Sequence, residues 1–375
     1  MSMNTNDIFA AIRAGDTKRL KQLLDNGTDP NVRNDKGRSA LSFVAIYVPT
    51  DATRQLLITA LDLDIEGHDG WTRFRNYDDT VRLETTRLLL ANGADPNIRD
   101  TSGDTALFQP ATVGKVEMVR LLLANGADPN VRRNDGSTSL IEAIKKDRKD
   151  VVRLLLENGA DPNVQNNHGD TALFLPATFG NVEMVRLLLA NRADPNVRRN
   201  DGSTSLIEAT KKRYADIIRL LLENGADPNV QNGDGNTALF ELLVSQVTDH
   251  LLGFDAQVRL PWNITSRKPQ ADIATLLLEH GADPNVRGNH GQTVLMVAAE
   301  RGYTEIVELL IRHGADREQK DVDGRTALML AIRKGRIAVM NVLLHAYTEH
   351  FNHYSDVPRA LVGDQGTETT TTERK

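Results

Sequence analysis

The five residues Gly93-Ala94-Asp95-Pro96-Asn97 decide the fold of this chain of 375 residues. The same phrase closes leucine-rich segments at four further places, Gly126, Gly159, Gly225 and Gly281. Altered copies begin at Gly27 (GTDPN), Arg192 (RADPN) and Gly314 (GADRE). Consecutive copies from Gly93 to Gly225 are evenly spaced, and Gly27 precedes Gly93 by twice the same interval. A fixed period of about 33 residues predicts stacked modules, each built from a turn and two helices.

The recurring phrase resembles the closing turn of ankyrin repeats, and the chain is identified as a member of that family over about residues 4–347. The resemblance implies an all-α ankyrin-repeat solenoid of about ten stacked helix-turn-helix modules, joined by β-hairpin-like loops. We therefore expect a single array over residues 1–347. The extension over residues 348–375, which ends in a Thr- and Glu-rich tail, is expected to be largely disordered.

The module that runs from Gly136 to Gly159 shows why these residues favour such a unit. Thr138 is placed to cap the first helix, and Asp150 lies at the start of the second. Gly159 accepts the left-handed backbone that ends a helix, and Pro162 prevents the helix from continuing. Each residue choice indicates the same local structure.

Two places depart from the regular spacing. Because Gly70 follows Gly37 by one full period, we interpret residues 70–92 as a degenerate repeat whose first helix spans residues 72–77. The module that opens at Gly235 is lengthened by an insertion at about residues 247–269. Between these two places, residues 104–169 and 170–235 form a duplicated pair of modules that differ at 12 of 66 positions.

Substitutions within the modules predict local distortions. Pro110 and Pro176 lie inside first helices, which should therefore bend or begin late. Arg192 replaces a glycine expected to have positive φ, at a cost of about 1 to 2 kcal/mol. Thr-Ala-Leu-Phe and Thr-Ser-Leu-Ile replace the family's Thr-Pro-Leu-His, so the usual hydrogen bonds between modules should be lost and the array softened.

Composition narrows the class of protein. The chain has no cysteine, which excludes disulfides, thiol nucleophiles and cysteine-ligated zinc. Its net charge of -6 argues against general binding to nucleic acid or to anionic membranes. The polar N-terminal residues and the absence of any long apolar run predict a cytoplasmic protein.

Motifs for catalysis, cofactors or metals are weak. No phosphate-binding glycine loop, Gly-x-Ser-x-Gly or His-Glu-x-x-His motif is present. Asp62, Asp64 and Glu66 resemble the start of a calcium loop, but Arg73 stands where its bidentate glutamate is needed. His345, His350 and His353 could hold a metal, but a polar helix end is the favoured interpretation. We predict no enzymatic activity, cofactor or metal.

In ankyrin repeats, partners usually contact the concave side, formed by the hairpin tips and the exposed ends of the first helices. Carried over to this sequence, the hairpin positions are Arg33, Arg99, Arg132, Gln165, Arg198, Gln231 and Arg287, with His168 at a tip. The first-helix ends supply Tyr47, Lys145, Lys146, Phe179, Lys211, Lys212 and Arg301. Arg132 with Lys145 and Lys146 recurs as Arg198 with Lys211 and Lys212, at about 20 Å if helix layers stack about every 10 Å.

The resulting hypothesis is a non-catalytic protein-protein interaction scaffold whose concave basic strip binds an acidic or phosphorylated protein segment. Lysines that only solvate helix ends are the competing interpretation. A second hypothesis places a partner on the insertion around Trp262, which could instead pack back on the array. An adaptor or secreted effector and, less favoured, an enzyme or toxin using the insertion are the alternatives. We expect a monomer.

Overall fold

The computed structural model describes residues 6–46, 68–245, 270–288 and 291–353, and the chain divides into two compact units, residues 1–282 and 283–375. Tyr47, Trp262, the insertion at 247–269 and the tail after residue 353 lie outside the described residues, as does the calcium-loop candidate before residue 68. The predictions made for these segments therefore stay predictions. So does the prediction of a single array over 1–347.

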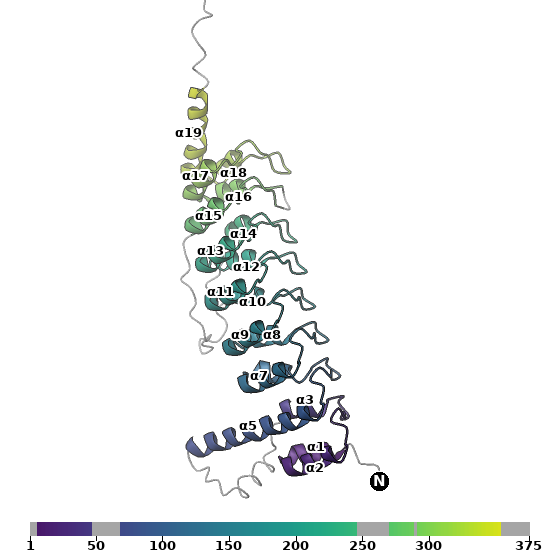
Figure 1. Ribbon diagram of the computed structural model, residues 1–375. Coiled ribbons are helices and arrows are strands. Elements are labelled where there is room, and N and C mark those ends of the chain that lie inside the picture. Colours follow the sequence, from purple (N-terminus) through teal and green to yellow (C-terminus); the bar gives the residue numbers. More distant parts are fainter. Residues whose placement is uncertain (1–5, 47–67, 246–269, 289–290, 354–375) are drawn as a thin grey trace, which may run out of the picture. The chain divides into compact units, whose positions relative to one another are not determined.

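The first unit consists of paired helices, which Figure 1 shows stacked from α1 to α15. Each first helix contacts its own second helix, as α8 contacts α9, and also the first helix of the next module. The helices are α1 (Asn6–Ala14), α2 (Thr17–Asp25), α3 (Ala40–Ile46), α5 (His68–Ala91), α6 (Phe108–Val113), α7 (Val116–Ala124), α8 (Ser139–Lys145), α9 (Lys149–Glu157), α10 (Phe174–Phe179), α11 (Val182–Ala190), α12 (Ser205–Lys211), α13 (Ala215–Glu223), α14 (Ala238–Val244) and α15 (Gln270–Glu279).

The second unit repeats the same construction. Helix α16 contacts α17 and α18, and α19 contacts α17 and α18. Their bounds are α16 (Val294–Arg301), α17 (Thr304–Arg312), α18 (Ala327–Arg333) and α19 (Ile337–His353). Helix α19 continues to His353, past residue 347 where we expected the array to end.

The described part of the chain contains no strand, and two isolated antiparallel bridges, Arg33 with Ser39 and Arg287 with Thr293, mark the hairpin-like loops. The expected all-helical repeat architecture is thus confirmed.

The core of the first unit is aliphatic and follows the module period. One leucine per module, at the start of the first helix, has at most 1% of its surface exposed: Leu107, Leu140, Leu173, Leu206 and Leu239. Burying one such side chain stabilises the fold by about 1.5 to 3 kcal/mol. Because the first helices of neighbouring modules contact each other, the stability of one module depends on the next.

The closing turns form a ladder that joins consecutive modules. Asn130 Nδ2 donates to the Gly159 carbonyl at 2.9 Å, and its Oδ1 accepts from the Asp161 amide at 2.7 Å. The same pair of bonds recurs from Asn97, Asn163, Asn196 and Asn285 to their following modules. The asparagine of the recurring phrase therefore holds the turn of the next module, and this explains why it recurs.

The ladder also connects the turn after α2 with the turn after α5. Asn31 Nδ2 donates directly to the Gly93 carbonyl at 3.2 Å, and Arg38 pairs with Asp100 at 3.3 Å. The described part of this stretch is one continuous helix, α5, rather than a first helix at 72–77 followed by a second. α5 contacts α3 and α2, so among the described residues it serves as the second helix of the module that α3 opens. The repeat predicted over residues 70–92 stays a prediction, because residues 47–67 before it lie outside the described residues.

Helix starts follow the local sequence as expected. Thr138 accepts a hydrogen bond from the Ile141 amide and caps α8, which begins at the next residue. In the modules that contain Pro110 and Pro176, helices α6 and α10 begin later, at Phe108 and Phe174, and have no side-chain cap. The late start predicted for these helices is confirmed, because proline fits the first turn of a helix but not its interior.

Candidate protein-binding surface

An exposed residue at the end of the first helix recurs in four successive modules, and we call Val113, Lys146, Phe179 and Lys212 the end row. Val113 and Phe179 are the last residues of α6 and α10, and Lys146 and Lys212 directly follow α8 and α12. The exposed fraction is 41% for Val113 and 47% for Phe179, and both lysines are exposed. The next residue has positive φ in every case, namely Gly114, Asp147, Gly180 and Arg213. The left-handed residue ends the helix and turns the chain toward the second helix, which leaves the end-row side chain uncovered.

In two modules, the residue directly before the end-row position is a lysine that pairs with a glutamate of the same helix. Lys145 Nζ lies 2.8 Å from Glu142 Oε1, and Lys211 Nζ lies 2.9 Å from Glu208 Oε1. Partial burial of Lys211 acts to lower its pKa, but the hydrogen bond and charge of Glu208 outweigh this effect, and the pKa is raised above its usual value of 10.5. The charge of each of these two lysines is therefore partly offset by a glutamate of the same helix.

Lys146 and Lys212 differ from them. No ion pair joins either side chain to another residue in the part of the chain that the structure describes. Their charges are thus exposed and available, and they lie in the end row with the apolar Val113 and Phe179.

The side chains at the hairpin positions, in contrast, mostly form hydrogen bonds with the next module. Arg99, Arg132 and Arg198 each donate through Nη2 to the backbone carbonyl of the residue 33 positions later, at 2.9 Å in each case. Gln165 makes the corresponding bond at 2.8 Å, Arg33 reaches the Arg99 carbonyl at 3.1 Å, and Gln231 bonds the Gly235 carbonyl in its own hairpin at 2.7 Å. This structural role was missed in the sequence analysis. The recurrence of an arginine or glutamine at the same hairpin position of each module could have indicated it.

A second contact between modules was also missed. The Arg199 guanidinium lies 4.6 Å from the centre of the Phe174 ring and pairs with Asp170 at 2.7 Å. Arg133, Phe108 and Asp104 repeat this cluster in the preceding pair of modules. Burial raises the pKa of Asp104 despite the neighbouring Arg133. Each cluster joins a first helix to the next hairpin through the phenylalanine that stands in place of the family's histidine, where we expected hydrogen bonds between modules to be lost.

The remaining candidate residues are dispersed. His168 is an exposed hairpin residue whose backbone amide donates to Asn166 Oδ1 at 2.9 Å. In the second unit, Arg301 ends α16 and is half-buried, and Arg287 donates to the Lys320 carbonyl at 3.0 Å. The structure brings together the end-row residues and the lysines beside them, but it does not bring His168 into this group.

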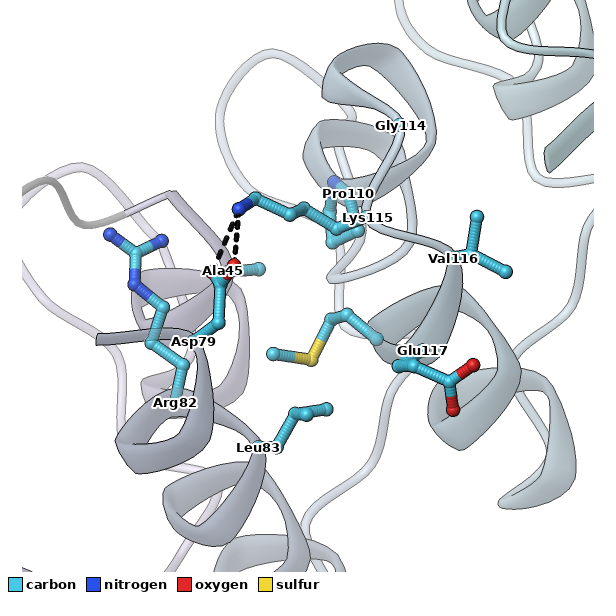
Figure 2. A pocket seen from close by; sticks show the side chains of 10 residues that line it. Ala45, Asp79, Arg82, Leu83, Pro110, Gly114, Lys115, Val116 and Glu117 are labelled. Carbon is cyan, nitrogen blue, oxygen red and sulfur yellow. Dashed lines mark hydrogen bonds and ion pairs between the residues drawn. The ribbon is translucent and has the colours of Figure 1, made fainter. Parts of the chain in front are cut away.

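A cavity of about 320 Å³ lies beside α5, α6 and α7 in the first unit, and Figure 2 shows its lining. Its walls are mainly apolar, with Leu83 and Pro110 among them, and Lys115 Nζ reaches Asp79 across it at 2.7 Å. The ion pair ties α5 to the start of α7. The described residues that line the cavity include no serine, cysteine or histidine.

The described residues contain no cluster of three or more His, Cys, Asp or Glu side chains suited to a metal ion. No helix in the described part of the chain combines the length and apolar character needed to cross a membrane.

Comparisons with known proteins agree with this geometry. The family model described as ankyrin repeats (3 copies) matches residues 79–166, 159–232 and 263–354. The chain belongs to the ankyrin-repeat family, whose members are generally protein-protein interaction modules and typically not enzymes.

Two solved structures of ankyrin repeat domains are similar to this chain. The ankyrin repeat domain of Bcl-3, described as a unique member of the IkappaB protein family, is 28% identical, with a TM-score of 0.53 over 65% of this chain and 99% of that chain. An ankyrin repeat domain from Acinetobacter baumannii AYE is also 28% identical, with a TM-score of 0.48 over 56% of this chain and 98% of that chain. No curated protein matches the sequence.

Proposed function

We propose that this chain is a non-catalytic scaffold that binds an acidic or phosphorylated protein segment along the first-helix ends of its first unit. The observation that carries the proposal is the placement of Lys146 and Lys212, exposed and without an ion pair among the described residues, beside the exposed Phe179. Cationic and apolar side chains on one surface provide both charge complementarity and an anchor for a partner.

The hairpin residues contribute less in this account. Their long side chains already bond the next module, as Arg132 bonds the Gln165 carbonyl at 2.9 Å. A partner could still contact the exposed edges of Arg132 and Arg198, because a guanidinium has five donors and the ladder does not use all of them. We therefore keep these positions as secondary contacts of the same surface.

Affinity capture from a lysate of the source cell tests the proposal. The wild-type chain is compared with a variant that carries Lys145, Lys146, Lys211 and Lys212 all changed to Glu. The matched control changes Arg120, Arg153, Arg186 and Arg219 to Glu, which alters the net charge equally on exposed positions of the second helices. All three proteins must show the same cooperative helical melt.

We expect the lysine variant to lose a protein partner with an acidic segment and the arginine variant to retain it. Recovery of the same partners by the wild type and the lysine variant would contradict the proposal. As part of the same proposal, the protein acts as a monomer in the cytoplasm. A molecular mass near 41.4 kDa in sedimentation would support the monomer, and twice that mass would contradict it.

A further inference from the structure

The end row alternates in chemistry from one module to the next. Val113 and Phe179 are apolar, and Lys146 and Lys212 are cationic, so the order along α6, α8, α10 and α12 is apolar, cationic, apolar, cationic. The alternation follows from the duplicated pair of modules, but the valine of the first copy is Phe179 in the second, so the position stays apolar. Both pairs of modules thus present the same order of side chains.

The spacing of this row sets the geometry of a partner. Neighbouring packed helices are about 8 to 10 Å apart, so one end-row side chain follows the next at about that distance. A polyproline II segment has three residues per turn and rises about 3.1 Å per residue, so equivalent side chains recur on one face about every 9 Å. In a β-strand, successive side chains point to opposite faces. Two residues three positions apart would therefore point in opposite directions, and only one of them could face the row.

The residues beside the end row are polar, which suits an extended chain better than a helix. The adjoining positions are Thr112 and Thr178, whose hydroxyls bond backbone carbonyls at 2.9 Å, and the two glutamate-paired lysines. A partner helix would need a wider apolar stripe to bury its face. The end row offers a single line of anchors.

We propose that the end row recognises a polyproline II segment in which apolar and acidic residues alternate at every third position. In this segment an apolar residue packs on Val113, an acidic residue three positions later pairs with Lys146, and the order repeats on Phe179 and Lys212. The inference rests on the proposed function and adds its specificity, namely the spacing and order of the residues that the scaffold accepts.

Two fluorescent peptides of identical composition test the spacing. The first carries apolar, Glu, apolar and Glu residues at positions 1, 4, 7 and 10, in a background of Pro, Ala and Gly. The second carries apolar residues at positions 1 and 4 and Glu at positions 7 and 10. The affinity of the full chain for each is measured by anisotropy, and we expect the first to bind about tenfold more tightly.

A variant that exchanges two end-row residues, Lys146→Phe with Phe179→Lys, keeps the composition of the surface and changes its order. The row then runs apolar, apolar, cationic, cationic, and the preference between the two peptides should reverse by a similar factor. Both positions are exposed, so the helical melt should match that of the wild type. The comparison of the two peptides uses the wild-type chain alone, so it tests the spacing independently of this variant.

The outcomes separate this inference from the proposed function. Equal binding of both peptides by the wild type, or a stronger preference for a helical peptide with the same residues every seven positions, would overturn the spacing. If the peptides failed this test but the lysine-to-Glu variant still lost the captured partner, the proposed function would stand and the proposed spacing would not. If capture no longer depended on the lysines, both would fail.

Discussion

The side-chain amide of Asn31 donates a hydrogen bond of 3.2 Å to the carbonyl oxygen of Gly93, 62 residues later in the sequence. Asn31 Oδ1 also accepts from the Asp95 amide at 2.8 Å. The module that ends with α2 therefore docks directly on the turn after α5. The N-terminal helices depend on this contact although a long stretch of chain separates the two residues.

Replacement of Asn31 by Ala should weaken this docking. Two hydrogen bonds are lost, which together contribute about 1 to 2 kcal/mol. Amide hydrogen exchange in residues 7–46 should become roughly 5- to 30-fold faster, while exchange in α8 to α13 should not change. The control is Asn92→Ala, which removes a bond of 2.8 Å to Leu88 within the end of α5. Equal acceleration in both variants would show that the ladder does not hold these helices.

Arg192 has φ of 65° at the position where other modules have glycine. Arg192→Gly should therefore raise the free energy of unfolding by about 1 kcal/mol, because it removes the strain of a left-handed non-glycine residue. Urea denaturation followed by circular dichroism measures the change. Arg186→Gly is the matched control in the interior of α11, where glycine should instead destabilise the helix by about 1 kcal/mol. A loss of stability on Arg192→Gly would refute the conclusion that the backbone of Arg192 is strained.

The Arg199 and Asp170 pair should show energetic coupling between modules. Arg199→Ala leaves a largely buried carboxylate without its partner, and Asp170→Asn removes that charge. The double variant should therefore be more stable than the sum of the two single effects predicts, by about 1 to 2 kcal/mol in a double-mutant cycle. Additive effects in urea denaturation would mean that the ion pair contributes no coupling.

Asp321 should make the second unit sensitive to acid. Burial acts to raise the pKa of Asp321, but the hydrogen bonds from Arg325 and its charge outweigh burial, and the pKa lies below its usual value of 3.8. A carboxyl whose pKa is lower in the folded state stabilises the fold above about pH 3.8, and this contribution is lost as the pH falls through the folded pKa. Arg325 Nη2 lies 2.7 Å from its Oδ2.

Asp321→Asn should lower the stability of residues 291–345 at pH 7 and flatten its decrease below pH 4. Hydrogen exchange in α16 to α18 between pH 7 and pH 3 measures this, after correction for the intrinsic exchange rates. Asp323→Asn is the control, because Asp323 pairs with the same Arg325 at 2.6 Å but its side chain is 59% exposed. If the stability of Asp321→Asn decreased below pH 4 as much as that of the wild type, Asp321 would not be the cause of the acid sensitivity.

Much of the fold could be predicted from the sequence, because the determining residues act locally and recur. Gly159, Thr138 and Pro110 each impose a backbone geometry wherever they stand, and the helix boundaries followed from them. The repeat predicted over residues 70–92 stays a prediction, although α5 runs without a break through its expected first helix at 72–77. Its spacing matched the period, but Asn31 contacts Gly93 directly, and a contact over 62 residues is not visible in spacing alone.

The candidate site could be predicted only in part. The lysines at the helix ends were identified from their place in the module, and the structure leaves Lys146 and Lys212 exposed. The bonds that engage Arg99 and Arg132 with the next module were not predicted, because a basic residue at a hairpin suggests a partner as readily as a carbonyl oxygen. Only the three-dimensional structure distinguishes these two roles.

The measurement that tests the central claim most directly is cross-linking from a single cysteine, because the chain contains no cysteine of its own. Phe179→Cys places a photoreactive label in the end row, and Arg186→Cys places it on the second helix of the same module. Both labelled proteins are irradiated in a lysate of the source cell, and the joined peptides are identified by mass spectrometry. The account predicts that an acidic protein segment is joined to position 179 and not to position 186. A partner joined at position 186 alone would contradict it.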